Sequence, residues 1–472
     1  MNRWCRCLGA LTAAMPAVLG ACAQPAGHEL LGSGLVPVGE HASPRGPDPS
    51  SDPAAIAMQA TEDVSAYWRA TYPEVYGGEF EEVSGFFPYG PNTEPPPCGD
   101  PPPAYEEIAD NAFYCDGDDI IAWDEARFIP EVNERYGGFT VAIVIAHEFG
   151  HAIQARAGAI DRTVDLELQA DCFAGAWTAY VVDGDAPTFE PDDVDLDQTV
   201  AGMTAIRDAP GTDPNDPFAH GSGFDRVTSF QDGFENGAEG CSDYDDPDVA
   251  RDTVEVPFDP EDDDQGVDEG NMVLEDGPDA PEGVGLLTRL EQDLNLFYAE
   301  VFTQLGHEWV PVDDLVLVDP DQDSIECGGE TADGDQLEFL ATYCPDENVV
   351  VLDGDGLVSA LYAIGDFAVG AEVARLWAQA AQVQLGVIND DQAGLQADCL
   401  TGVWSISLSD PESTPESKLS TSPGDLDEAI QGFLAFGGVL DEQVGTVFQR
   451  TDALRTGYRQ GYHGCETYAP LG

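Results

Sequence analysis

Two histidines and a glutamate stand close together in the segment 139–158, FTVAIVIAHEFGHAIQARAG. His147 and His151 are four residues apart, so on a helix both imidazoles lie on one face and can reach the same metal ion. Glu148 follows the first histidine and could take a proton from a water molecule on that metal. These residue types at this spacing predict a hydrolytic site with Zn²⁺ as its cofactor.

A hydrolytic zinc site needs a third protein ligand and keeps its fourth position open for water. The segment 165–177, DLELQADCFAGAW, supplies the candidate at Glu167, sixteen residues after His151. Asp171 lies one helical turn further on the same face, where it could orient a ligating histidine without binding the metal. The alternative assignment makes Asp171 the third ligand.

A third histidine, His220, precedes a predicted helix in the segment 218–226, FAHGSGFDR. As a catalytic group it could donate a hydrogen bond to the oxyanion of a tetrahedral intermediate, or steady the leaving group. The alternative is a loop histidine that caps the following helix together with Ser222.

Helices are the main elements that must position these residues. The apolar run 141–146 leads straight into the two histidines and predicts a buried helix. The segment 195–203, DLDQTVAGM, predicts the start of a helix capped by aspartate. The stretch FYCDGDDIIAWD at 113–124 predicts a turn that runs into a strand.

The chain holds eleven cysteines, and eight of them fall into two sets of four. The gaps are 17, 57 and 69 residues in the first set and 17, 55 and 66 in the second. Matching spacing indicates a tandem duplication, and an even number in an exported protein indicates disulfides rather than a thiolate metal site. Spacing leaves three pairings open within each set. The favoured pairs are Cys98–Cys115, Cys172–Cys241, Cys327–Cys344 and Cys399–Cys465.

Other segments repeat in the same order, among them LQADC at 168–172 and again at 395–399. Aligning the two copies places GDFAV, 365–369, opposite HEFGH, and leaves the second copy without metal ligands. In this alignment His147 corresponds to Gly365, Glu148 to Asp366, His151 to Val369, Glu167 to Gly394 and His220 to Val444. We therefore expect the second copy to be non-catalytic.

One acidic stretch of the second copy resembles a calcium-binding loop. DPDQDSIECGGE at 319–330 has acidic residues at loop positions 1, 3, 5 and 12. However, Ser324 stands where an EF-hand turn requires glycine, and Cys327 lies inside the loop. We do not expect this segment to bind calcium.

The N-terminus, MNRWCRCLGALTAAMPAVLGAC, has a basic start, a short apolar run and small residues. This pattern predicts a secretory signal peptide over 1–21. Its end, LGAC, resembles the lipobox of bacterial lipoproteins, in which Cys22 would carry the lipid. We expect an exported protein anchored by lipid to the outer face of the bacterial cytoplasmic membrane; the alternative is an ordinary signal peptide cut nearby.

Composition divides the rest of the chain into four parts. Residues 22–55 predict a flexible tether and 242–281 an acidic disordered linker, whereas 56–241 hold the candidate site and 282–472 the degenerate copy. The net charge of −74, from 17 basic and 91 acidic residues, excludes nucleic acid and anionic lipid headgroups as partners. The N-terminal lipid is then the expected link to a membrane, and the two copies could dock on each other.

Five motifs of the first copy occur together, in the same order, in the bacterial predicted neutral zinc metallopeptidases. They are CG at Cys98, FYCDGDDIIAWD, IAHEFGHAIQ, ELQADCFAGAW and AHGS. The resemblance covers about Asp63–Cys241. It implies an α+β, mainly helical zincin-like domain with a small β element and a gluzincin-like site. In that site His147, His151 and Glu167 would bind zinc and Glu148 would be the base.

This sequence departs from the family in two places. Ala152 stands where the family usually has another histidine, and fewer basic residues than usual follow AHGS. Neither position is a proposed ligand, but both could alter the choice of substrate.

These features together predict a zinc metallopeptidase that hydrolyses peptide bonds in peptides or proteins at the cell surface. The second copy would be a non-catalytic partner that docks on the first or recruits substrate, or one that only stabilises its neighbour; the stabilising role is the favoured one. The alternative is a non-catalytic binding or structural lipoprotein built on a metallopeptidase-like scaffold. Glu148 argues against this alternative, because a purely structural zinc site would not need it.

Overall fold

The structure is a computed structural model, and the residues that it describes form two similar halves. We call 52–254 the first half and 271–469 the second half. The described ranges are 52–158, 163–186, 188–214, 216, 219–242, 244, 253–254, 271–274, 285–387, 392–409, 419–437 and 445–469. The expected signal peptide, Cys22 and almost all of the expected tether lie outside these ranges. No helix within them is both long and apolar enough to cross a membrane.

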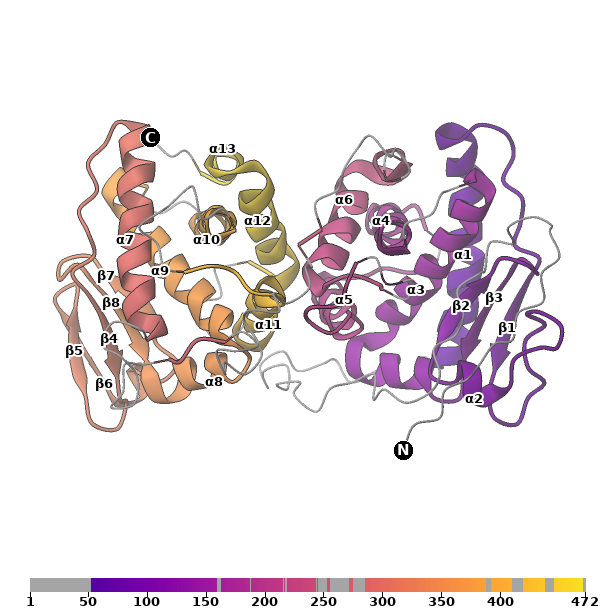
Figure 1. The fold of residues 1–472 in the computed structure, drawn as a ribbon, viewed down its shortest axis with the longest axis horizontal. Coiled ribbons are helices and arrows are strands. Elements are labelled where there is room, and N and C mark those ends of the chain that lie inside the picture. The colour runs from indigo at the N-terminus through magenta and orange to yellow at the C-terminus, as the bar shows by residue number, and fades with distance from the viewer. Residues whose placement is uncertain are drawn as a thin grey trace, which may run out of the picture.

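The described residues of the first half form six helices and a three-stranded sheet. The sheet lies at the outer end of this half in Figure 1. Its elements are α1 (Pro53–Val75), β1 (Gly85–Tyr89), α2 (Tyr105–Ile108), β2 (Ala112–Cys115), β3 (Ile120–Asp124), α3 (Phe128–Ala157), α4 (Thr163–Val182), α5 (Asp193–Ala205) and α6 (Gly223–Ser242).

The second half has the same order of long helices and sheet strands, with a hairpin added. Its elements are α7 (Leu286–Leu305), β4 (Asp314–Val318), β5 (Ser324–Cys327), β6 (Glu330–Asp333), β7 (Ala341–Cys344), β8 (Val349–Asp353), α8 (Ser359–Tyr362), α9 (Asp366–Leu385), α10 (Ala393–Leu408), α11 (Asp425–Phe436), α12 (Val447–Gln460) and α13 (Tyr462–Cys465). Short helical turns at Gly334–Gln336 and Gly354–Val358 join some of them.

The two three-stranded sheets have the same topology. In the first, the order is β1-β3-β2, with β3 parallel to β1 and antiparallel to β2. In the second, the order is β4-β8-β7, with the corresponding directions. The prediction of a mainly helical α+β fold is therefore confirmed. The segment that resembles a calcium loop forms a turn and the β5–β6 hairpin, instead of a loop between two helices.

Glycines bring α4 and α6 unusually close together. A Cβ atom on Gly175 would lie 1.8 Å from the carbonyl oxygen of Phe230, and one on Gly233 would lie 1.7 Å from that of Cys172. No larger side chain fits there, because real contacts between such atoms are about twice as long. A disulfide from Cys172 to Cys241 joins the same two helices. This packing fixes α6 against the helix that carries Glu167 and Asp171.

All four favoured cysteine pairs are disulfides in the structure. Each half has one bridge that spans 17 residues and a second one that spans 69 residues in the first half and 66 in the second. The long bridges join α4 to α6 and α10 to α13.

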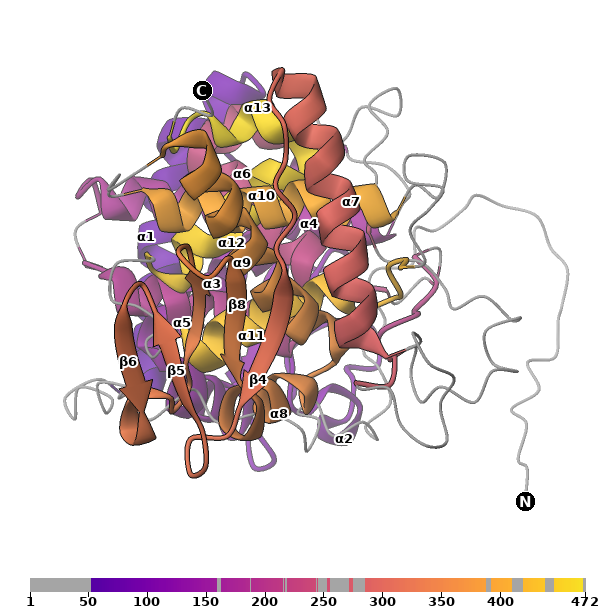
Figure 2. The same cartoon turned by 90° about the vertical axis from the view of Figure 1, so that its left-hand side faces the viewer.

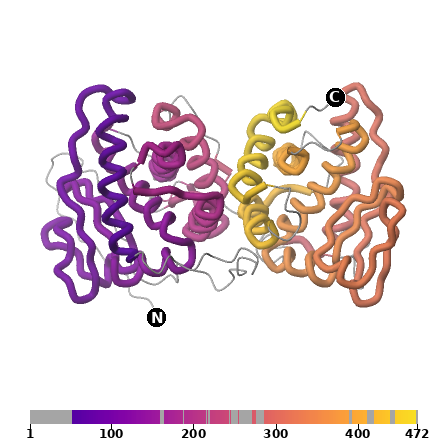
Figure 3. Tube along the Cα trace, turned by 180° about the vertical axis from the view of Figure 1, so that it is seen from behind, coloured from indigo at the N-terminus to yellow at the C-terminus, as the bar shows by residue number. Residues whose placement is uncertain are grey.

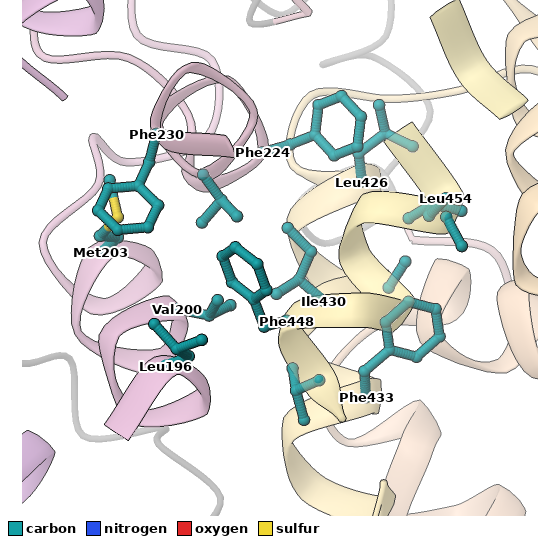
Figure 4. Close-up of a cluster of buried hydrophobic side chains, with 14 of the residues drawn as sticks. Leu196, Val200, Met203, Phe224, Phe230, Leu426, Ile430, Phe433, Phe448 and Leu454 are labelled. Carbon is teal, nitrogen blue, oxygen red and sulfur yellow. The ribbon is translucent and has the colours of Figure 1, made fainter. Parts of the chain in front are cut away.

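The halves meet through α5 and α6 on one side and α11 and α12 on the other, while the sheets lie at the two far ends (Figures 1 and 3). Viewed from the end of the molecule, the second half covers most of the first (Figure 2). Figure 4 shows the apolar side chains at this boundary, where Phe448 of α12 lies beside Val200 of α5. The Phe448 ring also contacts Phe234, at 5.2 Å between ring centroids, and Phe230, at 6.3 Å. The two halves therefore share a continuous hydrophobic core.

Two predicted boundaries need correction. The tether was expected to continue through residue 55, but α1 begins at Pro53, with Asp52 capping it through the Ala54 amide. The segment 242–281 was expected to be a disordered linker that buries nothing, and most of it lies outside the described residues. Among its described residues, 271–274 contact the start of α9, where the Met272 amide donates to Asp366 and Asn271 accepts from the Asp366 amide.

Candidate metal centre

Helix α3 carries His147 and His151. Its run of buried apolar residues, Val141–Ala146, embeds the helix in the core and leaves the next turn facing α4. The His147 and His151 rings lie 4.8 Å apart between centroids and are almost perpendicular. A Cβ on Gly150 would lie 2.6 Å from Cα of Ala170, so the glycine lets α4 approach this turn. The short separation of the helices places α4 within reach of both imidazoles.

Helix α4 delivers Glu167 to the same point. One carboxylate oxygen of Glu167 lies 3.2 Å from Nε2 of His147 and the other lies 3.5 Å from Nε2 of His151. Ligand atoms of these three residues all lie within 4.8 Å of one another. Two imidazole nitrogens and one carboxylate oxygen are a donor set that zinc takes in hydrolytic sites. The residues present therefore fit the metal that the sequence predicts.

Asp171 contacts the opposite side of His147. Nδ1 of His147 donates to Oδ1 of Asp171 at 2.7 Å, which leaves Nε2 directed at Glu167. The Arg226 guanidinium donates in turn to both Asp171 oxygens, at 2.8 and 3.0 Å. A carboxylate behind a ligating histidine fixes the tautomer and the orientation of its ring. The geometry thus favours the assignment of Glu167 as ligand and Asp171 as orienting residue over the reverse.

His151 has its own orienting residue in Gln154. Nδ1 of His151 donates to Oε1 of Gln154 at 2.9 Å, and the side-chain Nε2 of Gln154 donates to the carbonyl oxygen of Leu166 at 2.6 Å. Neither Gln154 nor Arg226 was among the residues selected from the sequence. The spacing offered a signal for each: Gln154 follows His151 by three residues on the same helix, and Arg226 lies in FDR, which matches FQR in the second half.

The charged groups of this cluster shift one another's pKa values. Burial alone would lower the pKa of His147, but Asp171 and Glu167 outweigh it and raise that pKa to about 10. Burial would raise the pKa of Glu167, yet His151 and His147 hold it well below the usual value. Burial would likewise raise the pKa of Asp171, but Arg226 and His147 hold it below its usual range. Both carboxylates therefore stay ionised, whereas a metal would have to displace a proton from His147, because a ligating imidazole is neutral.

Glu148 lies beside this cluster in a different environment. Its side chain is buried, and burial raises the pKa of its carboxyl, although His147 and His151 oppose the shift. A raised pKa makes a carboxylate a stronger base, which favours its use in general acid–base catalysis. Glu148 thus has the properties expected of the base.

His220 lies in the loop before α6, and its side chain is 43% exposed. Its amide donates to Oδ2 of Asp208 at 2.6 Å, and its Nδ1 lies 3.4 Å from Oδ1 of the same residue. Burial would lower the pKa of His220, but Asp208 and the Glu167 charge raise it. Ser222 caps the following helix, since its hydroxyl accepts from the Asp225 amide. The capping role considered for His220 thus belongs to Ser222.

The contacts of α9 correct the alignment of the second half. Gln382 donates to the carbonyl of Ala393, as Gln154 does to that of Leu166. Phe367 stacks on Trp404 as Phe139 stacks on Trp177, with centroid distances of 5.6 and 5.8 Å. Both helices end at a left-handed glycine, Gly386 in the second half and Gly158 in the first. GDFAV therefore corresponds to GGFTV at 137–141 and not to HEFGH.

In the corrected register, different residues stand at the metal-site positions. His147 corresponds to Arg375, Glu148 to Leu376 and His151 to Gln379, while Glu167 still corresponds to Gly394. Arg375 is buried and pairs with Glu372, at 3.0 Å. Asp398, at the position of Asp171, accepts from Arg450 at 2.8 and 3.0 Å. The conclusion that the second half lacks the ligands is unchanged, but a fixed cation occupies the place of the first histidine.

A helix that presents two histidines and a glutamate next to a second glutamate is the arrangement of a metal-dependent hydrolase site. Residues 97–244 match the model of a family described as "Putative neutral zinc metallopeptidase". The name of that family indicates a zinc-dependent hydrolase. The match covers the strands β2 and β3 and the helices α3 to α6, and it ends before the second half.

Proteins similar to this chain include two bacterial relatives. "Uncharacterized protein Rv2575" of Mycobacterium tuberculosis is 28% identical over 200 residues, which cover 37% of this chain and 64% of the relative. "Uncharacterized protein YpfJ" of Escherichia coli K12 is 30% identical over 151 residues, which cover 26% of this chain and 50% of the relative. The chain thus spans half to somewhat under two thirds of the length of these relatives. No solved structure matches it significantly.

Proposed function

We propose that this protein is a zinc metallopeptidase whose single active site lies in the first half. The observation that carries the proposal is the convergence of His147, His151 and Glu167, with ligand atoms within 4.8 Å of one another. Glu148 is buried beside them and belongs to the same helix as the histidines. A binding protein would need neither this glutamate nor the raised pKa that burial gives it.

The residues of the chain divide the chemistry among them. Zn²⁺ held by His147, His151 and Glu167 would acidify water and polarise the scissile carbonyl. Glu148 takes the proton from the attacking water and passes it to the leaving amine. His220 donates a hydrogen bond to the oxygen that becomes negative as the tetrahedral intermediate forms. The substrates are peptides or proteins.

The location of the protein is part of the proposal. The LGAC sequence that ends at Cys22 supports a lipid anchor and exposure at the outer surface of the cytoplasmic membrane. Four disulfides support an oxidising compartment, because such bonds persist mainly in exported proteins. The enzyme would then act on peptides outside the cytoplasm.

The second half is, in this proposal, a duplicated domain that lost its catalytic residues. Support comes from the matching sheet topology, the matching disulfide spans and the pair Asp398–Arg450, which repeats Asp171–Arg226. Arg375 and Gln379 at the histidine positions offer no ligand set for zinc. The chain would therefore bind one zinc ion and not two.

The experiment that tests the function compares the wild-type chain with Glu148→Gln on a diverse peptide mixture, with mass spectrometry of the products. We expect cleavage by the zinc-loaded wild type, loss of cleavage on chelation, and almost none with the variant, although it still binds zinc. Cleavage that survives in the variant would exclude Glu148 as the base. Zinc binding without cleavage of any peptide would favour the non-catalytic alternative.

A further inference from the structure

The boundary between the halves contains a carboxylate that reaches into the active-site half. Asp427, on α11 of the second half, accepts hydrogen bonds from the amides of Gly223, at 3.0 Å, and Phe224, at 2.7 Å. These are the first two residues of α6. The first amides of a helix have no partner within it, and the positive end of its dipole favours an anion. A side chain of the second half thus caps a helix of the first.

A further contact strengthens this cap. Arg207, which follows α5 of the first half, forms an ion pair with the same Asp427 carboxylate, with its Nε 2.8 Å from Oδ2. The Asp427 side chain is almost completely buried. Loss of either partner of such an ion pair is costly, because the remaining charge stays largely removed from water. Asp427 therefore fixes both the start of α6 and the segment that follows α5.

The capped turn leads directly to the candidate metal centre. Arg226 is two residues beyond Phe224, in the first turn of α6, and it donates to both oxygens of Asp171. Asp171 accepts from Nδ1 of His147, whose Nε2 faces Glu167. An unbroken series of hydrogen bonds and one helical turn thus connects Asp427 to a proposed zinc ligand.

The loop with His220 is held at the same place. Asp208 accepts from the amides of His220 and Gly221, and its own amide donates to the Gly221 carbonyl at 3.1 Å. Asp208 is the neighbour of Arg207, and Gly221 lies two residues before the capped Gly223. Displacement of the α6 start would therefore move His220 as well as Arg226.

We infer that Asp427 is a positioning residue for the metal centre, so that the second half holds the active site of the first in its working geometry. This inference rests on the proposed function. It gives the second half a role in the reaction that needs neither a metal nor a substrate site of its own. The chain offers an internal control, because the interface contains a second carboxylate in the equivalent position.

That control is Asp197 on α5 of the first half. It accepts from the Phe448 amide at 2.8 Å, at the start of α12 in the second half. DLD at 195–197 matches DLD at 425–427, so Asp197 corresponds to Asp427. The two aspartates make the same kind of contact across the same boundary. They differ in what lies behind the capped helix: α6 leads to His147, whereas α12 leads to Arg450 and Asp398.

The experiment compares Asp427→Asn with Asp197→Asn in the full chain. Zinc affinity is measured by competition with a chelator, the Co²⁺-substituted site by its visible absorption spectrum, and overall stability by thermal unfolding. We expect Asp427→Asn to weaken zinc binding about tenfold, as loss of a residue behind a ligand does, and to change the Co²⁺ spectrum. We expect Asp197→Asn to leave the zinc affinity within twofold of wild type and the Co²⁺ spectrum unchanged, even if its melting temperature falls as much as that of Asp427→Asn.

Equal effects of the two variants on zinc binding, or no effect of Asp427→Asn, would overturn the inference while leaving the proposed function in place. A wild-type chain that binds no zinc would overturn the proposed function itself. Should Asp427→Asn fail to fold, Arg207→Gln removes the other side of the same contact. We expect it to weaken zinc binding in the same direction, and unchanged zinc affinity in a folded Arg207→Gln chain would count against the inference.

Discussion

Arg226 and Asp171 form a buried bidentate ion pair, with side chains 4% and 3% exposed and N···O distances of 2.8 and 3.0 Å. Arg450 and Asp398 repeat the pair in the second half with the same two distances. In the first half only, the aspartate also accepts a hydrogen bond from a histidine. The pair thus joins two helices in both halves and additionally orients His147 in one of them.

Because only Asp171 accepts from a histidine, substitution of Asp171 and of Asp398 should affect zinc binding differently. Asp171→Asn and Asp398→Asn should each lower the free energy of unfolding, by about 3–5 kcal/mol, because each leaves a buried arginine without its charge partner. Only Asp171→Asn should also lower zinc affinity, about 10- to 100-fold. Denaturant unfolding and chelator competition measure the two effects. Equal zinc affinity in both variants would show that Asp171 does not orient His147.

Glu148 is predicted to act on the proton and not on the metal. Glu148→Gln keeps the shape of the side chain but removes the proton acceptor, so turnover should fall about 10²- to 10⁴-fold. Zinc content, measured by mass spectrometry, should remain as in wild type. Loss of zinc from this variant would instead make Glu148 a ligand.

Gln154 is predicted to orient His151. Gln154→Met removes the acceptor for the Nδ1 proton and should lower zinc affinity about tenfold. Gln382→Met is the matched control, since Gln382 makes the corresponding bond to Ala393 in a half without histidines. The measurement is zinc affinity of both variants, and a similar value for the two would contradict the prediction.

The close contact of α4 and α6 predicts a steric effect without a change of charge. A methyl group at residue 175 would meet the Phe230 carbonyl oxygen. Gly175→Ala should therefore lower the free energy of unfolding by about 1–3 kcal/mol or more, because the helices must separate. It should also weaken zinc binding, because α6 carries Arg226. Gly402→Ala, which meets the Leu454 carbonyl in the second half, should destabilise without changing zinc affinity.

Three carboxyl groups of the second half predict a dependence of stability on pH. Asp366, Asp425 and Glu428 converge beside the start of α9. Burial, followed by mutual repulsion, raises the pKa of Asp425 to about 7 and that of Glu428 to about 9. Burial also raises the pKa of Asp366.

The folded protein therefore keeps protons that the unfolded chain, with carboxyl pKa values near ~4, releases. The stability that this provides is present at low pH and is lost as the pH rises toward about 9. Glu428→Gln, which introduces the residue found at the matching Gln198, should reduce the loss. Urea unfolding at pH 5, 7 and 9 measures it. A variant with the same pH slope as wild type would show that Glu428 does not titrate in this way.

Much of the site could be predicted because its signals are local. The spacing of His147 and His151 places both on one helix face, and Glu167 follows on the next helix. These local features were sufficient to predict that the three residues form one site. The repeated gaps indicated two sets of four cysteines, and the structure contains the favoured one of the three pairings that spacing left open in each set. Gln154 and Arg226 were not predicted because many glutamines and arginines occupy helix faces. Only the packed structure shows that Gln154 contacts His151 and that Arg226 contacts Asp171.

The alignment of the second half failed for a physical reason. GDFAV and HEFGH share a phenylalanine and an acidic residue, but they occupy different turns of their helices. The correct register is defined by tertiary contacts, namely the stacking of Phe367 on Trp404 and the bond from Gln382. The partner of Asp427 was equally hidden, since two residues more than 200 positions apart meet only when both halves are folded.

The most direct test of the proposed zinc site is the zinc content of the chain from Ala23 onward, measured by mass spectrometry beside Glu167→Ala. We expect one zinc ion per wild-type chain and little or none in the variant. No zinc in the wild type after reconstitution, or an undiminished content in Glu167→Ala, would contradict it.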